Sequence, residues 1–209
     1  MLDKLTGLYM RKYFLDQLDL EVKRCQRYRR PLSVLALELE YAYFHPGIDV
    51  RWSMGYTLFK QLGPLVLSTL RNVDLAARYE GEIFACFLPE TGVQGAEIAA
   101  ERLRSRIEKH WFLGHVPGTD PQGTEERFRV AMNVGVAIFP EHGRTPLELI
   151  DAARHALAQA SKQGGNKVVM ADAVAPPLEE EAPAGDGVPR PQSDAPASWD
   201  ALASEQPKN

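Results

Sequence analysis

The chain of 209 residues carries 28 acidic and 24 basic side chains, with a formal net charge of −4 at pH 7. Eight of the acidic residues but only two of the basic ones lie from Asp172 onward, so residues 1–171 are close to neutral. This balance argues against non-specific nucleic-acid binding, and no apolar run is long enough to span a membrane. We therefore expect neither nucleic acid nor a membrane among the partners.

The composition divides the chain into two parts. Residues 1–171 are numerous enough to bury a core and are expected to form one domain. Residues 172–209 hold seven of the fifteen prolines and few apolar residues, which predicts a disordered acidic tail rich in proline and alanine. Cys25 and Cys86 lack metal-ligand spacing, and no apolar stretch of a signal peptide follows Met1. These features predict a cytoplasmic protein.

The first predicted element is a helix. Apolar residues recur at helical spacing from about Tyr9 to Arg29, and Pro31 ends the pattern. The basic residues in its last turns are expected to form a solvated face: Arg24, Arg27, Arg29 and Arg30.

A central strand and a second helix are predicted next. Residues Leu32–Tyr41 are largely apolar, as is typical of a strand covered on both faces. Glu38 and Glu40 lie at its C-terminal end, where open α/β sheets usually place their ligands. After a loop at residues 42–52, a helix is expected over about Ser53–Arg71, with a kink at Pro64.

The middle of the chain predicts a β-hairpin with carboxylates at its tip. A short apolar strand leads to the turn Glu80-Gly81-Glu82, and a second strand runs from Phe84 to Leu88. Arg71 and Asp74 stand before the first strand. As an isolated pair they are typical of a surface ion pair at a helix end, and the alternative is that they bind a ligand.

The remaining elements complete an α/β pattern. They are a helix at Val93–Lys109, a loop at residues 110–126, a strand at Phe128–Phe139, a helix at Pro146–Lys162 with Thr145 as its N-cap, and a strand at Asn166–Met170. The order α-β-α-β-β-α-β-α-β predicts an α/β sandwich, in which helices flank a mixed central sheet.

Several motifs stand in a characteristic order along this domain: Asp3-x-Leu5-Thr6-Gly7-Leu8, the strand to Glu40, the hairpin at Arg78-Tyr79, Asn133-Val-Gly-Val-Ala and Gly164-Gly165-Asn166. Together they resemble the GGDEF domain of diguanylate cyclases over about residues 1–170. The resemblance implies the palm architecture of nucleotide cyclases.

The resemblance also implies a chemistry. Members of the family join two GTP molecules into cyclic di-GMP, with one GTP held by each of two facing domains. Two metal ions bridge the triphosphate and activate a 3′-hydroxyl, so an active member requires Mg²⁺. Glu38 stands at the position of the family's first metal-binding Asp, and Glu82 at the third position of the signature turn. Both are therefore candidate metal ligands.

Other positions depart from the family pattern. The signature Gly-Gly-Asp/Glu-Glu-Phe corresponds here to Glu80-Gly81-Glu82-Ile83-Phe84, so a glutamate replaces the first glycine and an isoleucine the second acid. The positions that contact guanine and phosphate carry other residues: Tyr43, Pro46, Tyr56, Ser161 and Gly165. Because each lost hydrogen bond costs about 1–3 kcal/mol, the resemblance implies a degenerate active site with negligible GTP turnover.

The family's inhibitory site is matched more closely. Its Arg-x-x-Asp motif corresponds to Arg71-Asn72-Val73-Asp74, and a further arginine corresponds to Arg102. An Arg fork can donate to guanine O6 and N7, and an Asp can accept guanine N–H groups. The resemblance thus implies cyclic di-GMP as the ligand of Arg71, Asp74 and Arg102.

Three functions remain open on this basis. The leading one is a catalytically inactive receptor for cyclic di-GMP, which needs no cofactor and signals through a homodimer or a protein partner. The second is a weakly active diguanylate cyclase that uses Glu38, Glu82 and Mg²⁺. The third is an interaction scaffold that binds no nucleotide.

Overall fold

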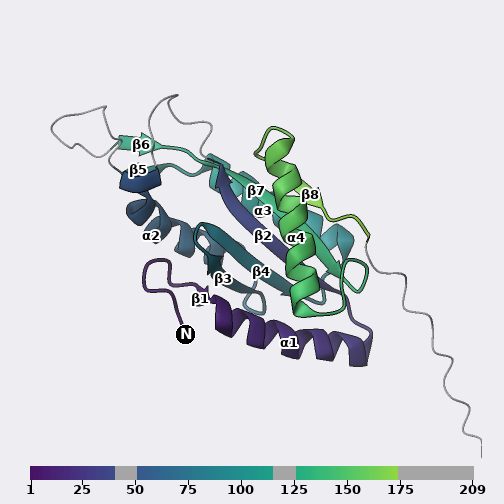
Figure 1. Cartoon of the computed structure of the whole chain (residues 1–209). Helices are drawn as coiled ribbons and strands as arrows, with labels where there is room; N and C mark the ends of the chain where they lie inside the picture. The colour runs from purple at the N-terminus through teal and green to yellow at the C-terminus, as the bar shows by residue number, and fades with distance from the viewer. Residues whose placement is uncertain (41–50, 115–125, 174–209) are drawn as a thin grey trace, which may run out of the picture. The chain divides into compact units, whose positions relative to one another are not determined.

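A mixed sheet of six strands forms the centre of the domain (Figure 1). The computed structural model describes residues 1–40, 51–114 and 126–173. The loop predicted at residues 42–52 and the tail predicted at residues 172–209 lie almost wholly outside these ranges, as do Tyr43 and Pro46.

The element bounds follow the hydrophobic pattern of the chain. The helices are α1 (Arg11–Tyr28), α2 (Arg51–Thr69), α3 (Val93–Lys109) and α4 (Pro146–Lys162). The strands are β1 (Tyr9–Met10), β2 (Leu32–Glu40), β3 (Leu75–Glu80), β4 (Ile83–Pro89), β5 (Phe112–Gly114), β6 (Glu126–Phe128), β7 (Ala131–Phe139) and β8 (Val168–Met170).

The strand order of the main sheet is β1-β3-β4-β2-β7-β8. Strands β3, β4, β2 and β7 pair in antiparallel fashion, whereas β1 joins β3 and β8 joins β7 in parallel. Strand β2 lies between β4 and β7, and residues 32–37 are buried throughout. Such a strand is apolar on both faces because helices cover both sides of the sheet.

Two hydrophobic cores lie on opposite faces of this sheet. Helices α2 and α3 close one of them, and α1 and α4 close the other. Figure 1 shows α1 and α4 on the same side of the strands. Gly135 in β7 allows α4 to approach closely, because a Cβ atom there would lie 2.0 Å from the backbone oxygen of Ala153. The fold is therefore the predicted α/β sandwich.

Most predicted elements are confirmed, and α3 and α4 have the expected bounds. Two element boundaries are wrong. Tyr9 and Met10 were expected in the first helix but form β1, where they pair with Ala77 and Arg78 of β3. Phe128 was expected in the long strand but belongs to β6, and β7 begins only at Ala131. In both cases tertiary pairing overrides the local pattern.

Strands β5 and β6 form a separate two-stranded sheet, and β5 lies in the region predicted as a loop, residues 110–126. Gln61 of α2 extends it in the manner of a strand: its Nε2 donates to the Leu113 carbonyl oxygen at 2.7 Å, and its Oε1 accepts from the Leu113 N–H at 3.1 Å. Among the described residues, none of the helices combines the length and apolar character needed to cross a bilayer.

Candidate functional site

Arg71 and Asp74 form a closed turn between α2 and β3. The Arg71 N–H donates to Asp74 Oδ2 at 2.7 Å, and the Asp74 N–H donates to the Arg71 carbonyl oxygen at 3.0 Å. The two residues therefore hold each other through their backbones. The Arg71 side chain is exposed, and its guanidinium makes no hydrogen bond or ion pair with another described residue.

The Asp74 carboxylate is only half satisfied. Its Oδ1 atom is shielded from solvent and has no hydrogen-bond partner among the described residues. Burial raises the pKa of Asp74, while the hydrogen bond from the Arg71 backbone and the charges of Arg71 and Arg102 act in the opposite direction. The charge of Arg102, on α3, thus acts on the same carboxylate. Arg71 and Asp74 thus lie together, whereas the assignment of all three residues to one ligand site stays a prediction.

A cavity of about 700 Å³ opens beside this turn. Arg71 and Asp74 line it on one side, and α1 contributes Arg24 and Leu20 on the other. Arg102 is outside the lining of this cavity. The cavity therefore combines two arginines and apolar side chains with three carboxylates, those of Asp74, Glu21 and Glu90.

Arg24 lies on a solvated face of α1, as predicted, but its place in the cavity beside Arg71 was not predicted. The Arg24 guanidinium lies 3.5 Å from Glu90 and 3.6 Å from Glu21, and it remains more than half exposed. Ion pairs this exposed are weak and exchange readily with solvent or ligand. No local motif marks Arg24, since its place beside Arg71 arises only when α1 packs near the start of β3.

The hairpin tip carries carboxylates, as predicted. Gly81 has φ of 55°, a left-handed conformation that favours glycine, and Arg78 Nε donates to its carbonyl oxygen at 2.9 Å. The exposed Glu80 carboxylate lies 3.6 Å from Arg154 of α4. Glu82 follows the glycine and is half-buried. The tip is therefore ordered by the side chains around it.

Ile83 occupies a boundary of the hydrophobic core. It packs against the core beneath α1 and α4, and in the sheet it stands directly opposite Glu38 of β2. The neighbour of Glu38 on the hairpin is thus an apolar side chain. Phe84 is fully buried on the other face of the sheet.

The end of β2 also packs against the loop after α4. Asn133 Nδ2 donates to Glu40 Oε2 at 2.9 Å. Gly165 has φ of 72°, and a Cβ atom there would lie 3.1 Å from the Glu40 side chain. A longer side chain at position 165 would therefore have to share this space with Glu40.

The described residues hold no cluster of three or more His, Cys, Asp or Glu side chains that could bind a metal ion. Magnesium is commonly held by one or two protein carboxylates together with substrate phosphates. Glu38 and Glu82 on their own do not make a protein-only metal site, and their assignment as ligands stays a prediction. The predicted guanine position Tyr56 is 70% exposed on α2.

The domain is a mixed sheet covered by helices on both faces, and a carboxylate-bearing hairpin lies beside the end of its central strand. This arrangement is that of an α/β domain of the nucleotide-cyclase type. The model of the family described as "Diguanylate cyclase, GGDEF domain" matches residues 1–167. The chain belongs to this family, as the motifs predict.

Individual relatives agree with this assignment. The response regulator PleD of Caulobacter vibrioides is 30% identical over 167 residues, which is 80% of this chain but only 35% of PleD. A truncated form of TpbB (YfiN) from Pseudomonas aeruginosa, comprising only the GGDEF domain, gives a TM-score of 0.69 at 22% identity and covers 82% of this chain and 95% of that one. The GGDEF domain of DgcB from Caulobacter crescentus, in complex with c-di-GMP, gives 0.65 at 22% identity and covers 82% and 93%. The two structures establish a shared fold.

Proposed function

We propose that this chain is a receptor for cyclic di-GMP with a degenerate active site that does not turn over GTP. The observation that carries the proposal is the Asp74 carboxylate, which has one oxygen without a partner and is acted on by the charges of Arg71 and Arg102. A buried acceptor without a donor is costly, so a ligand that supplies a donor is favoured there.

Guanine matches the chemistry of this place. The exposed Arg71 guanidinium can donate to guanine O6 and N7 in two parallel bonds, while Asp74 accepts from the guanine N–H groups. Arg24, which lines the cavity, and Arg102, whose charge acts on Asp74, would supply positive charge for the phosphates. The ligand has two guanines and two phosphates, and the related DgcB domain was solved with it.

The tip of the hairpin supports the part of the proposal that concerns the degenerate active site. Ile83 replaces an acid and is packed into the core boundary, so it can neither bind a metal nor move a proton. Glu80 adds negative charge where the triphosphate would approach, and only the partly exposed Arg154 offsets it. The exposed Tyr56 offers no carboxylate for reading guanine. These losses disfavour GTP and leave the ligand pair at the start of the hairpin intact.

Isothermal titration calorimetry with cyclic di-GMP tests the receptor function. We expect saturable binding to the full chain and no detectable binding to an Arg71→Ala variant. Lys60→Ala is the matched control, because Lys60 is an exposed cation on the helix that leads to Arg71. Equal binding by wild type and Arg71→Ala, or no binding heat, would overturn the receptor.

Incubation with GTP and either Mg²⁺ or Mn²⁺ tests whether the chain turns over GTP. We expect no cyclic di-GMP product by liquid chromatography. Product that disappears in Glu82→Gln would establish the weak cyclase instead. If neither GTP nor cyclic di-GMP shifts the melting temperature at about 100 times the expected Kd, where a bound ligand adds about 2.7 kcal/mol, the chain is a scaffold that binds no nucleotide.

A further inference from the structure

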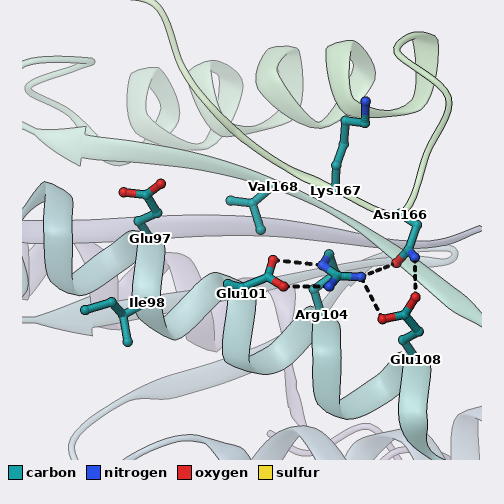
Figure 2. A pocket seen from close by; sticks show the side chains of 8 residues that line it. All are labelled: Glu97, Ile98, Glu101, Arg104, Glu108, Asn166, Lys167 and Val168. Carbon is teal, nitrogen blue, oxygen red and sulfur yellow. Dashed lines mark hydrogen bonds and ion pairs between the residues drawn. The ribbon is translucent and has the colours of Figure 1, made fainter.

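The outer strand β8 ends the main sheet beside helix α3, and a cavity of about 780 Å³ opens between them (Figure 2). Among the described residues, β8 pairs only with β7. The Val134 N–H donates to the Lys167 carbonyl oxygen at 2.9 Å, and the Ala171 N–H donates to the Val136 carbonyl oxygen at 2.7 Å. Backbone groups alternate along a strand, so Val168 and Met170 direct theirs away from β7.

A network of charged side chains fixes the wall of this cavity. The Arg104 guanidinium bonds both oxygens of Glu101, and its Nη1 donates to Glu108 at 3.0 Å and to Asn166 Oδ1 at 2.6 Å. Asn166 Nδ2 donates in turn to Glu108 Oε1 at 2.6 Å. Asn166 lies two residues before β8, so the network ties α3 to the start of the strand. The groove is therefore ordered before any partner arrives.

The network stays charged at neutral pH. Hydrogen bonds from Arg104 lower the pKa of Glu101, and a hydrogen bond from Asn166 lowers the pKa of Glu108. The Arg104 side chain is only 14% exposed, and its guanidinium donates to these partners. These side chains thus bond to one another, and a partner peptide can bind beside them without breaking these bonds.

The lining of the groove includes two apolar side chains, Ile98 and Val168. Ile98 is 61% exposed. Glu97 is exposed beside Ile98, and Glu101 follows one helical turn later. The one other cation of the lining, Lys167, donates to the Gln163 carbonyl oxygen and points away from the network in Figure 2. Glu101 and Glu108 are paired with Arg104, so the open negative charge of the described lining is that of Glu97.

The spacing of these groups fits an extended peptide. Residues one turn apart on a helix are separated by about 6 Å along its axis, and alternate residues of a strand by about 6.6 Å. Every second side chain of an added strand would face α3, where Glu97 and Glu101 lie. A segment with basic residues at alternate positions would place one against Glu97 and the next beside Glu101, which keeps its bonds to Arg104 and is 52% exposed. The backbone of the segment would pair with Val168 and Met170.

We propose that β8 and α3 form a docking site for an extended, basic segment of a partner protein, which adds a seventh strand to the sheet. Charge selects the occupant. The chain's own residues 174–209 follow β8 in the sequence but contain Glu179, Glu180 and Glu181, whose charge would be repelled by Glu97. A cationic segment from another protein has the complementary charge.

Amide hydrogen exchange measured by NMR on the full chain tests this site, with acetyl-Lys-Val-Lys-Val-Lys-Val-amide as the probe. The Val168 and Met170 amides should exchange quickly in the free protein and slow at least tenfold with the peptide. The Ala171 amide is the internal reference, because it already donates to Val136. The same peptide with Glu in place of Lys should give no protection.

Two variants locate the contacts. Met170→Pro removes a donor on the open side of β8 without removing one from the β7 ladder, and it should weaken peptide binding about fivefold. Glu97→Gln should weaken it about two- to fivefold, whereas Asp151→Asn, an exposed acid on α4, should have no effect.

Three results overturn the proposal. The first is protection of the Val168 and Met170 amides in the free chain, since the chain's own tail would then cover the edge. The second is equal protection by the acidic peptide, which would remove the charge argument. The third is no protection at millimolar concentrations of the basic peptide, which would make β8 a short edge strand that is blunted against pairing.

Discussion

Replacing Asp74 by asparagine separates ligand recognition from folding. The asparagine side-chain oxygen can still accept from the Arg71 N–H, as Asp74 Oδ2 does at 2.7 Å. Its amide nitrogen would then stand at the place of Oδ1, the oxygen without a partner. A donor at that position faces the guanine N–H donors. The substitution therefore keeps the turn and removes the acceptor.

The magnitudes of the two effects differ. Hydrogen bonds to a charged group contribute about 1.5–3 kcal/mol, so we expect cyclic di-GMP affinity to fall by about tenfold to 150-fold. Stability should not fall at pH 7, because burial raises the pKa of Asp74 and so disfavours its ionised form in the folded state. In the wild type, this destabilisation is fully present above the raised pKa of Asp74 in the folded state. It is lost as pH falls towards 3.8, the pKa of Asp74 in the unfolded chain.

The assay pairs calorimetry with thermal unfolding of the wild type and Asp74→Asn. Asp151→Asn, an exposed change of the same kind on α4, controls for the loss of one negative charge. We expect weaker binding with an unchanged or raised melting temperature for Asp74→Asn. Wild-type affinity in this variant would refute the assigned role of Asp74. A melting temperature lowered by about 6 °C or more would show that Asp74 holds the fold instead.

Three further changes test the fold that positions the site. Gly135→Ala should lower the unfolding free energy by about 3 kcal/mol in urea titrations, because its Cβ would lie 2.0 Å from the Ala153 oxygen, and a wild-type midpoint would contradict this packing. Thr145→Ala should cost about 1 kcal/mol by loss of the helix cap, and Thr145→Ser should restore most of it. Burial lowers the pKa of His142, whose Nδ1 accepts from the Ile138 N–H. The contribution of neutral His142 to the free energy of unfolding is therefore full above pH 6.5, and it is lost as pH falls towards the lowered pKa of the folded state. His142→Gln should therefore flatten the decline of stability below pH 6.5, and an unchanged slope would assign the decline to other groups.

The parts of the fold that sequence could predict are those set by local periodicity. The apolar run of β2, the helical spacing in α3 and the cap at Thr145 each identify an element from a few neighbouring residues. Strand β1 could not be found in this way, because two residues have no periodicity and pair only once β3 is in place. Phe128 was misplaced for the same reason, since its partner Phe112 lies across a long connection.

In the candidate site, too, local contacts could be predicted from sequence and long-range contacts could not. Arg71 and Asp74 are three residues apart, so their turn is local and could be predicted. The charge of Arg102 was linked to them only by the family resemblance, and the effect on the Asp74 pKa gives that link a physical content. Arg24 lies 47 positions before Arg71 in the chain, and only the packing of α1 brings it to the same cavity. The network around Arg104 likewise joins α3 to residues far along the chain.

The most direct test of the proposed function is one calorimetric titration of cyclic di-GMP into the full chain, repeated with Arg71→Ala and Lys60→Ala. We predict saturable binding to the wild type and to Lys60→Ala, and none to Arg71→Ala. Binding that survives in Arg71→Ala, or no binding heat in the wild type, would contradict the account.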